Sequence, residues 1–435
     1  FKLRESNWSD GSPLTANDFE YAWKRAMDPA TASEYSWLWE YTNVVGAADF
    51  AYGVEGATAD AVGVKAIDDY TLEVTLTAPT DYFGSLMSFY HFHPVKQSAV
   101  EAGPDGAWAI DPDLVVNNGA FTLTEYTIGE GMVLEKNPEY WNADAVKIDT
   151  INAAFLDDAN TAYAAYEAGD FDFIPSVPTA EIPRLIAEDP NFYVFPLLGT
   201  DSYNFNLDLP LWEDVRVRKA LALGFDRTVV TETLASGQVP AAGFVPPGFK
   251  DHEGRDFFET AGTFGLSADD SGVEEAQQLL ADAGYPGGEG FPEFVLMYNT
   301  SEGHQTVAEL MQEMWKTNLG INCTLENQEW AVFQDTRKEG DYEMARGGWL
   351  TDFMDPSGML AIFQEGNAYN DPNYYSEEFE AAMAAALSTT DKAEHYNKLY
   401  EAQEIFINDF AVIPVYHYSD TMLASERVVG WDLSL

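Results

Sequence analysis

The sequence predicts a mixed α/β fold with at least two lobes. A chain of 435 residues is too long for a single hydrophobic core, so two or three domains are expected. Residues 294–298, 304–317 and 321–325 follow the order strand, helix, strand, which is a βαβ unit with parallel strands. The residue pattern of the sequence changes near Gly199, and we expect the chain to pass from one lobe to the other there.

The first half of the chain predicts a helix, two hairpins and a second helix. Thr15 and Asp18 stand three residues apart, as in a capping arrangement at a helix start. Apolar and polar residues alternate around turn residues over 62–78 and 120–134, which predicts the hairpins. The helix expected over 159–168 ends at a glycine.

The second half adds helices around the βαβ unit. Residues 213–236 predict one long amphipathic helix, and 271–283 another, with Ser271 placed as its cap. Two further helices are expected over 376–387 and 391–408, before a buried strand over 411–416.

Charge excludes two classes of partner. The 73 Asp and Glu residues against 22 Lys and Arg residues leave a formal net charge of −51. Such a surface repels phosphate backbones and anionic lipid headgroups, so we expect no nucleic-acid partner and no direct membrane insertion. No apolar run approaches the ~20 residues that cross a bilayer. The single cysteine, Cys323, cannot form an internal disulfide.

Motifs of catalysis and cofactor binding are scarce. The sequence has no Gly-rich phosphate loop, no HExxH, no paired CxxC and no GxSxG. His91 and His93 would share one face of a strand, as half of a metal site, but no third ligand follows at a suitable spacing. We therefore expect no enzyme, no cofactor and no metal, and we interpret the two histidines as rings packed before Pro94.

The aromatic residues indicate binding instead. Eleven Trp and 23 Tyr exceed what a core requires, and such rings commonly line clefts for small ligands. The clearest group runs from Trp330 through Arg337 to residues 346–356, where a short strand at 344–345 is expected to enter a Gly-Gly bend. A core aromatic and a surface or capping carboxylate remain the alternatives for Trp349 and Asp352.

Motifs over nearly the whole chain resemble the peptide-binding receptors of ABC importers, the oligopeptide-binding protein family of extracytoplasmic solute-binding proteins. The matching segments are WSDGSPLTA (8–16), GVKAIDD (63–69), NGAF (118–121), LEKNP (134–138), DVRVRKA (214–220), RGGWLTDFMDP (346–356) and IPVY (413–416).

The resemblance implies a two-lobed, periplasmic-binding-protein-like (type II) fold with a small accessory domain and a ligand cleft between the lobes. The expected division is an accessory domain over 1–95, lobe I over 96–198, lobe II over 199–418 and a return to lobe I over 419–435. Family members build several strands of lobe I before the point where this sequence starts, so we expect lobe I to be incomplete here.

The resemblance also implies which residues meet a peptide. Asp352 is expected to pair with the α-ammonium group, since a carboxylate buried on closure needs a cation. Residues 346–350 (Arg346, Gly347, Gly348, Trp349 and Leu350) are expected to pair with the peptide backbone as an added strand. The pocket walls would include Trp330, Trp349 and Tyr35, with Tyr203 in the hinge segment 199–206. The basic residues expected near the peptide's carboxyl terminus are Arg346, Arg337 and His304.

The implied function is capture of oligopeptides by hinge closure and delivery to the permease subunits of an ABC importer. The receptor would be a monomer outside the cytoplasm, free in the periplasm or lipid-anchored to the outer face of the cell membrane. The same fold could instead bind a dipeptide, an oligosaccharide, a metal chelate or a signalling peptide. A hydrolase on a similar scaffold is the remote alternative.

Overall fold

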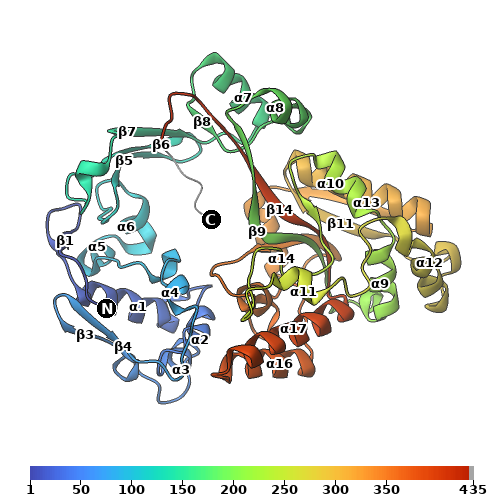
Figure 1. Ribbon diagram of the computed structural model, residues 1–435, viewed down its shortest axis with the longest axis horizontal. Coiled ribbons are helices and arrows are strands. Elements are labelled where there is room, and N and C mark those ends of the chain that lie inside the picture. Colours follow the sequence, from blue (N-terminus) through green and yellow to red (C-terminus); the bar gives the residue numbers. More distant parts are fainter. Residues whose placement is uncertain (431–435) are drawn as a thin grey trace. The chain divides into compact units, whose positions relative to one another are not determined.

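The structure is a computed structural model of the chain, and it describes residues 1–430 (Figure 1). The chain forms two compact units, Phe1–Asp157 and Asp158–Leu435. The four-part division expected from the sequence stays a proposal. Its boundary at 199 falls inside one strand, and residues 431–435 of its last part lie outside the described residues.

The first unit contains short helices around small antiparallel sheets. Its helices are α1 (Ala16–Met27), α2 (Leu38–Tyr41), α3 (Ala47–Ala51), α4 (Phe83–Leu86), α5 (Gln97–Ala102) and α6 (Ala107–Ile110). Its strands are β1 (Ser6–Asn7), β2 (Pro13–Leu14), β3 (Val64–Asp68), β4 (Thr71–Val74), β5 (Phe121–Thr127), β6 (Gly131–Lys136) and β7 (Thr150–Ala154).

The two hairpins and the helix start that were expected in the first unit are confirmed. Strands β3 and β4 form one expected hairpin, and β5 and β6 form the other, with β7 added beside β6. Thr15 and Asp18 make a capping box at the start of α1. The core packs aromatic rings: the indole N–H of Trp23 donates to the carbonyl of Phe92 at 2.8 Å, and Trp39 lies against both rings.

The second unit is built on one mixed sheet. Its strands are β8 (Phe173–Ile174), β9 (Phe192–Phe205), β10 (Val239–Pro240), β11 (Phe294–Asn299), β12 (Cys323–Gln328), β13 (Met344–Leu350) and β14 (Val412–Ala424). They lie in the order β10-β14-β9-β13-β11-β12, with β8 also paired to β14. Strand β11 runs parallel to β12 and β13, whereas β9 is antiparallel to β13 and β14. The expected βαβ unit is therefore confirmed.

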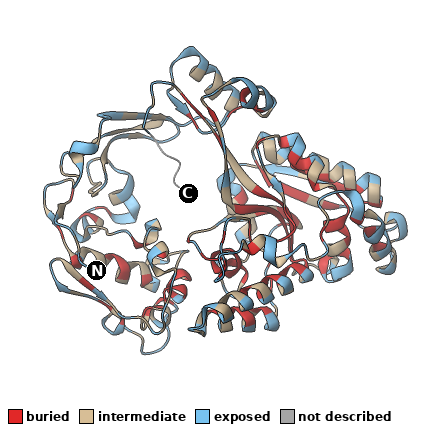
Figure 2. Cartoon of the chain, in the orientation of Figure 1, coloured by how far each residue is buried: buried red, intermediate tan, exposed pale blue. Residues whose placement is uncertain are grey.

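Helices cover this sheet. They are α7 (Ala159–Ala168), α8 (Ile182–Glu188), α9 (Val215–Leu223), α10 (Arg227–Leu234), α11 (Phe257–Ala261), α12 (Val273–Asp282), α13 (Glu302–Leu319), α14 (Trp330–Lys338), α15 (Ser357–Leu360), α16 (Glu377–Ser388) and α17 (Lys392–Asp409). Figure 1 shows α9, α10, α12 and α13 together on one side of the sheet. Buried residues concentrate on its central strands (Figure 2).

None of the helices within residues 1–430 is long and apolar enough to cross a membrane.

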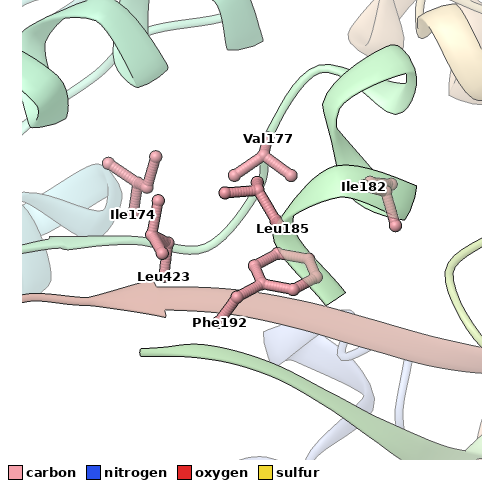
Figure 3. Packing of buried hydrophobic residues seen from close by; sticks show 6 residues of the cluster. All are labelled: Ile174, Val177, Ile182, Leu185, Phe192 and Leu423. Carbon is pink, nitrogen blue, oxygen red and sulfur yellow. The ribbon is translucent and has the colours of Figure 1, made fainter. Parts of the chain in front are cut away.

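A separate small hydrophobic core lies where β9 begins and β14 ends. Side chains from β8, the loop that follows it, α8 and these two strands pack together there (Figure 3). The members of this core are Ile174, Val177, Ile182, Leu185, Phe192 and Leu423. Helix α7 contributes Ala162, Tyr163 and Tyr166 at the edge of this core.

Two expectations about helices in the second unit are wrong in detail. The long helix over 213–236 is two helices, because Gly224 ends α9 and the Asp226 carboxylate caps α10 by accepting from Val229 N–H at 3.0 Å. Ser271 does not cap α12: it lies in a 3-10 turn, Asp270–Gly272, which Asp269 caps by accepting from Ser271 N–H, and α12 then begins after Gly272 without a side-chain cap.

The cap at Asp226 predicts a stability difference. Asp226→Ala leaves the Val229 N–H without its acceptor and is expected to lower the free energy of unfolding by about 1 kcal/mol. Asp226→Asn keeps an acceptor oxygen and should retain most of the stability. Urea unfolding of both variants measures the difference, and an alanine variant as stable as the asparagine variant would contradict this role.

Candidate functional site

The expected site segment lies on β13, in the middle of the sheet. Strand β13 pairs with β9 along its whole length, from Met344 opposite Phe205 to Leu350 opposite Gly199. The expected bend at Gly347-Gly348 is therefore wrong, because the strand runs straight through both glycines.

The two glycines are there because neighbouring groups approach closely. A Cβ at Gly347 would collide with the side-chain amide of Asn204, and one at Gly348 with the hydroxyl of Tyr418. Gly348 also has a φ of 138°, a conformation that L side chains rarely adopt. The glycines thus permit a flat strand packed against β9 and β14 rather than a turn.

The other edge of β13 is open. Strand β11 pairs with β13 only at Met344 and Ala345. Within the described part of the chain, no strand pairs with that edge over 346–350.

The backbone groups of this edge point outward at alternate residues. Thr351 N–H donates to Leu198 O of β9 at 2.9 Å. Because hydrogen-bonded positions alternate along an antiparallel ladder, the N–H and C=O groups of Gly348 and Leu350 point away from β9. An extended chain can therefore bind at this edge by backbone hydrogen bonds.

Asp352 follows β13 and carries a buried oxygen without a partner. Its Oδ2 atom is inaccessible to solvent and makes no hydrogen bond. Burial raises the pKa of this carboxyl to about 7. A buried carboxylate that lacks both a donor and a counter-ion is costly, so the position is suited to an added cation.

Arg346 is held in a polar network under the strand. Its Nε and Nη2 atoms lie 2.8 and 2.6 Å from Asp201 Oδ2, and Nη2 also donates to the hydroxyl of Tyr418 at 2.7 Å. The two charged side chains are 11% and 2% exposed. Burial by itself lowers the pKa of the Arg346 guanidinium, but the Asp201 carboxylate holds it above its usual value.

Arg337 and His304 lie near the same network. Arg337 Nη1 donates to the carbonyl of Arg346 at 3.2 Å and lies 3.4 Å from the carboxylate of Asp371. His304 Nδ1 lies 3.3 Å from the carbonyl of Asn299, whose side chain accepts from Arg346. Burial first, and the charge of Arg346 second, lower the pKa of His304 to about 3.

The expected site residues also include aromatic and apolar side chains. The indole N–H of Trp349 donates to the carbonyl of Gly358 at 3.1 Å, which fixes the ring. Trp330 begins α14, is 50% exposed and stacks on Phe333. Leu350, at the end of β13, is also 50% exposed. Exposed apolar side chains such as Trp330 and Leu350 are suited to contact a ligand's side chains.

The remaining two expected residues differ in their surroundings. Tyr203 is fully buried on β9 opposite Arg346, and its hydroxyl has no hydrogen-bond partner. Tyr35 belongs to the first unit, where its ring lies against those of Phe89, Tyr90 and His91. The second unit thus brings ten of the eleven expected residues onto β9, β13, α13, α14 and the segment that follows β13.

The acidic partners of the arginines were not predicted. Asp201 lies within the hinge segment 199–206, but nothing in the sequence spacing indicates that it is the partner of Arg346. Asp371 is separated from Arg337 by a helix and a strand. Charge alone could not single out either of them among 73 acids.

Possible metal ligands do not cluster. Among residues 1–430, no three His, Cys, Asp or Glu side chains stand together in a way that could hold a metal ion. His91 lies in a 3-10 turn over Tyr90–Phe92 rather than on a strand, and its ring packs against Trp39 and Phe92.

Known proteins resemble the chain over nearly all of its length. The periplasmic oligopeptide-binding protein OppA of Escherichia coli (strain K12) is 37% identical over 435 residues, covering 99% of this chain and 78% of the relative. The oligopeptide-binding protein OppA of Bacillus subtilis (strain 168) is 34% identical over 441 residues, with 99% and 78% covered. Both relatives are named as binding proteins rather than as enzymes.

Solved structures agree with this similarity. The crystal structure of Haemophilus influenzae OppA in complex with RPPGFSPFR matches with a TM-score of 0.86 and 34% identity, covering 98% of this chain and 82% of that chain. The chain accordingly has the mixed α/β, two-lobed type II fold of periplasmic binding proteins, as the sequence predicted. The profile described as "Bacterial extracellular solute-binding proteins, family 5 Middle" matches residues 1–371. The chain therefore belongs to the bacterial extracellular solute-binding proteins of family 5.

Proposed function

We propose that this protein is an extracytoplasmic receptor that captures oligopeptides and delivers them to the permease of an ABC importer, without catalysis. The observation that carries the proposal is the buried oxygen of Asp352, which has neither a donor nor a counter-ion. The α-ammonium group of a peptide supplies both a charge and three donors.

The open edge of β13 supports the same ligand class. Outward backbone groups at Gly348 and Leu350 bind a peptide's backbone without reading its side chains, which suits ligands of varied sequence. Asp352 lies two residues beyond this edge, so one extended ligand can meet both. The ligand contacts that we propose are Asp352, Trp349, Arg346, Gly347, Gly348, Leu350, Trp330, Arg337, His304, Tyr203 and Tyr35.

Capture by hinge closure requires no chemical step. A ligand shifts a conformational equilibrium only by its difference in affinity for the two states, so a peptide that binds the closed form more tightly keeps it closed. We propose that the receptor acts as a monomer, free in the periplasm or lipid-anchored at the outer face of the membrane.

Native mass spectrometry tests the ligand class directly. Protein purified under mild conditions is expected to carry peptides from the expression host, at the mass of one chain plus ligand. A retained oligosaccharide, metal chelate or dipeptide would identify one of the alternative ligands. Incubation with a bound peptide should leave the peptide intact, since cleavage products would reveal a hydrolase.

The pKa of Asp352 predicts how affinity depends on pH. The bound α-ammonium group favours the ionised carboxylate, so the complex holds fewer protons at Asp352 than the free protein does. Affinity should therefore fall by up to about tenfold per pH unit below pH 7. The peptide's own amine, with a pKa of about 8, limits binding at higher pH. His304, with its pKa of about 3, stays neutral throughout.

Calorimetry at pH 5.5, 6.5 and 7.5 measures this dependence. Asp352→Asn, which cannot titrate, serves as the control because every other group affects both proteins alike. An equally steep loss of affinity in the asparagine variant would show that another group is responsible.

A further inference from the structure

We infer that His395 is a positioning residue for the peptide site, because its positively charged ring ties the segment that follows β13 to helices α16 and α17. The tie depends on pH, since a histidine ring loses its charge as the pH rises. The charge is a property of the protein without ligand, whereas the effect on binding rests on the proposed function.

Both ring nitrogens of His395 face groups that accept hydrogen bonds. Nε2 lies 3.0 Å from Asp355 Oδ2, and Nδ1 lies 2.9 Å from the carbonyl oxygen of Ala386. A carbonyl oxygen can only accept, so Nδ1 carries a proton. In a neutral ring the lone pair of Nε2 would then point at a carboxylate, whereas the charged ring donates to both groups. The geometry therefore fits the charged form.

Asp355 is the counter-ion of this ring. Its other oxygen, Oδ1, accepts from the N–H and the hydroxyl of Ser357 at 3.0 and 2.6 Å, which stabilises negative charge on the carboxylate. The side chains of His395 and Asp355 are 14% and 3% exposed. Solvent and salt therefore screen this pair little.

The carbonyl of Ala386 also favours a charged ring. It belongs to the last turn of α16, which packs beside α17 (Figure 1). Carbonyl groups in a last turn have no partner within their helix and form the negative end of the helix dipole. A cation at this position is therefore stabilised.

Other charged groups near the ring lie in solvent. Residues 381–390, the last turns of α16 and the loop after it, include no charged side chain. His252 is exposed and stacks on Tyr396, the residue after His395. The charged residues around the start of α17 are also exposed: Asp391, Lys392 and Glu394. Exposed charges act weakly on a partly buried group, so Asp355 dominates.

The pair holds the turn that carries Asp352. Asp355 follows Asp352 by three residues, and its carbonyl accepts from Gly358 N–H at 3.0 Å. The carbonyl of Gly358 in turn accepts from the indole N–H of Trp349 at 3.1 Å. Residues 355–363 are buried, so this turn is fixed from below by the fold. Loss of the charge on the ring is therefore expected to loosen the turn that places Asp352 and Trp349.

Nitrogen NMR of the histidine rings tests the charge directly. In ligand-free protein at pH 7.5, both ring nitrogens of His395 are expected to carry protons, although a histidine in water loses its charge near about pH 6.5. His395→Gln assigns the signals among the six histidines by their loss. A neutral His395 ring at pH 7.5 overturns the inference, whatever the peptides show.

Urea unfolding at pH 6, 7.5 and 9 tests the tie. The folded ring keeps a proton that the unfolded chain loses above about pH 6.5, so this contribution to stability is complete below that pH and is lost as the pH rises. From pH 6 to 9, the unaltered protein should lose more stability than His395→Gln, by up to about tenfold in the unfolding constant per pH unit. His93→Gln, at an exposed histidine, is the matched control and should behave as the unaltered protein does. Equal pH dependence in His395→Gln and the unaltered protein overturns the tie.

Calorimetry with alanine peptides of three, four and five residues tests the effect on binding. At pH 7.5, His395→Gln is expected to bind about tenfold more weakly, and His93→Gln as tightly as the unaltered protein. Adding Asp355→Asn to His395→Gln gives two amides that can pair without a charge, and this double variant should recover part of the affinity. Equal affinity in His395→Gln overturns the positioning role. If none of the peptides binds the unaltered protein, that role fails together with the proposed function, whereas NMR still decides the charge of the ring.

Discussion

Replacing Asp352 by alanine is expected to weaken binding of free-amine peptides by about 2–5 kcal/mol. In the complex, the ammonium group would lie against the oxygen that has no partner in the protein itself. Truncation of one member of a buried, hydrogen-bonded charge pair costs this much, because the remaining charge stays desolvated. Calorimetry with a peptide that binds the unaltered protein measures the loss.

Two controls separate recognition from damage to the fold. Asp341→Asn, at an exposed acid, should bind the peptide as the unaltered protein does. Asp352→Asn should unfold at the same temperature or higher without ligand, because the amide removes a buried carboxylate that has no counter-ion. Equal affinity of Asp352→Ala and the unaltered protein would exclude the contact with the ammonium group.

Replacing Arg346 by methionine is expected to lower the free energy of unfolding by about 3–5 kcal/mol. The substitution leaves the Asp201 carboxylate, 2% exposed, without the guanidinium that lies 2.6 Å away. Breaking a buried pair on one side is costly because the remaining charge can neither reach water nor find another cation. Urea unfolding of ligand-free protein measures the change.

The second unit offers a matched surface pair as a control. Arg216 also lies 2.6 Å from an aspartate, Asp214, but these side chains are 47% and 34% exposed. Arg216→Met should therefore change stability little, since solvent and salt screen the pair. The double variant Asp201→Asn with Arg346→Met should recover part of the loss. A single Arg346→Met variant as stable as Arg216→Met would contradict the role of burial.

Most secondary structure of the chain could be predicted from local pattern. The hairpins, the βαβ unit and the paired helices near the end appear where periodicity placed them. The exceptions depend on single side chains: Asp226 could begin a new helix or lie inside a longer one. At Gly347-Gly348, local preference favours a bend, but the approach of Asn204 and Tyr418 requires glycine in a straight strand.

The sequence predicted those site residues that are neighbours along the chain, but not the partners that come from other elements. The run from Arg346 to Asp352 forms one continuous segment, so a sequence motif is enough to find it. The partners of its charges come from other elements, because Asp201 lies on β9 and Asp371 beyond β13. Pairing over such separations depends on the order of strands in the sheet.

The sequence by itself determined the fold class, the family and the residues of the binding segment, because each follows from local periodicity or from a contiguous motif. Only the tertiary structure decided which charges have partners. Strand order places β9 beside β13, so Asp201 pairs with Arg346, whereas the buried Oδ2 of Asp352, beyond the end of β13, has no hydrogen-bond partner. Burial makes this difference costly, because a desolvated charge without a counter-ion is unfavourable. Asp352 therefore differs from the chain's many surface acids, because its Oδ2 atom is shielded from water and has no hydrogen-bond partner.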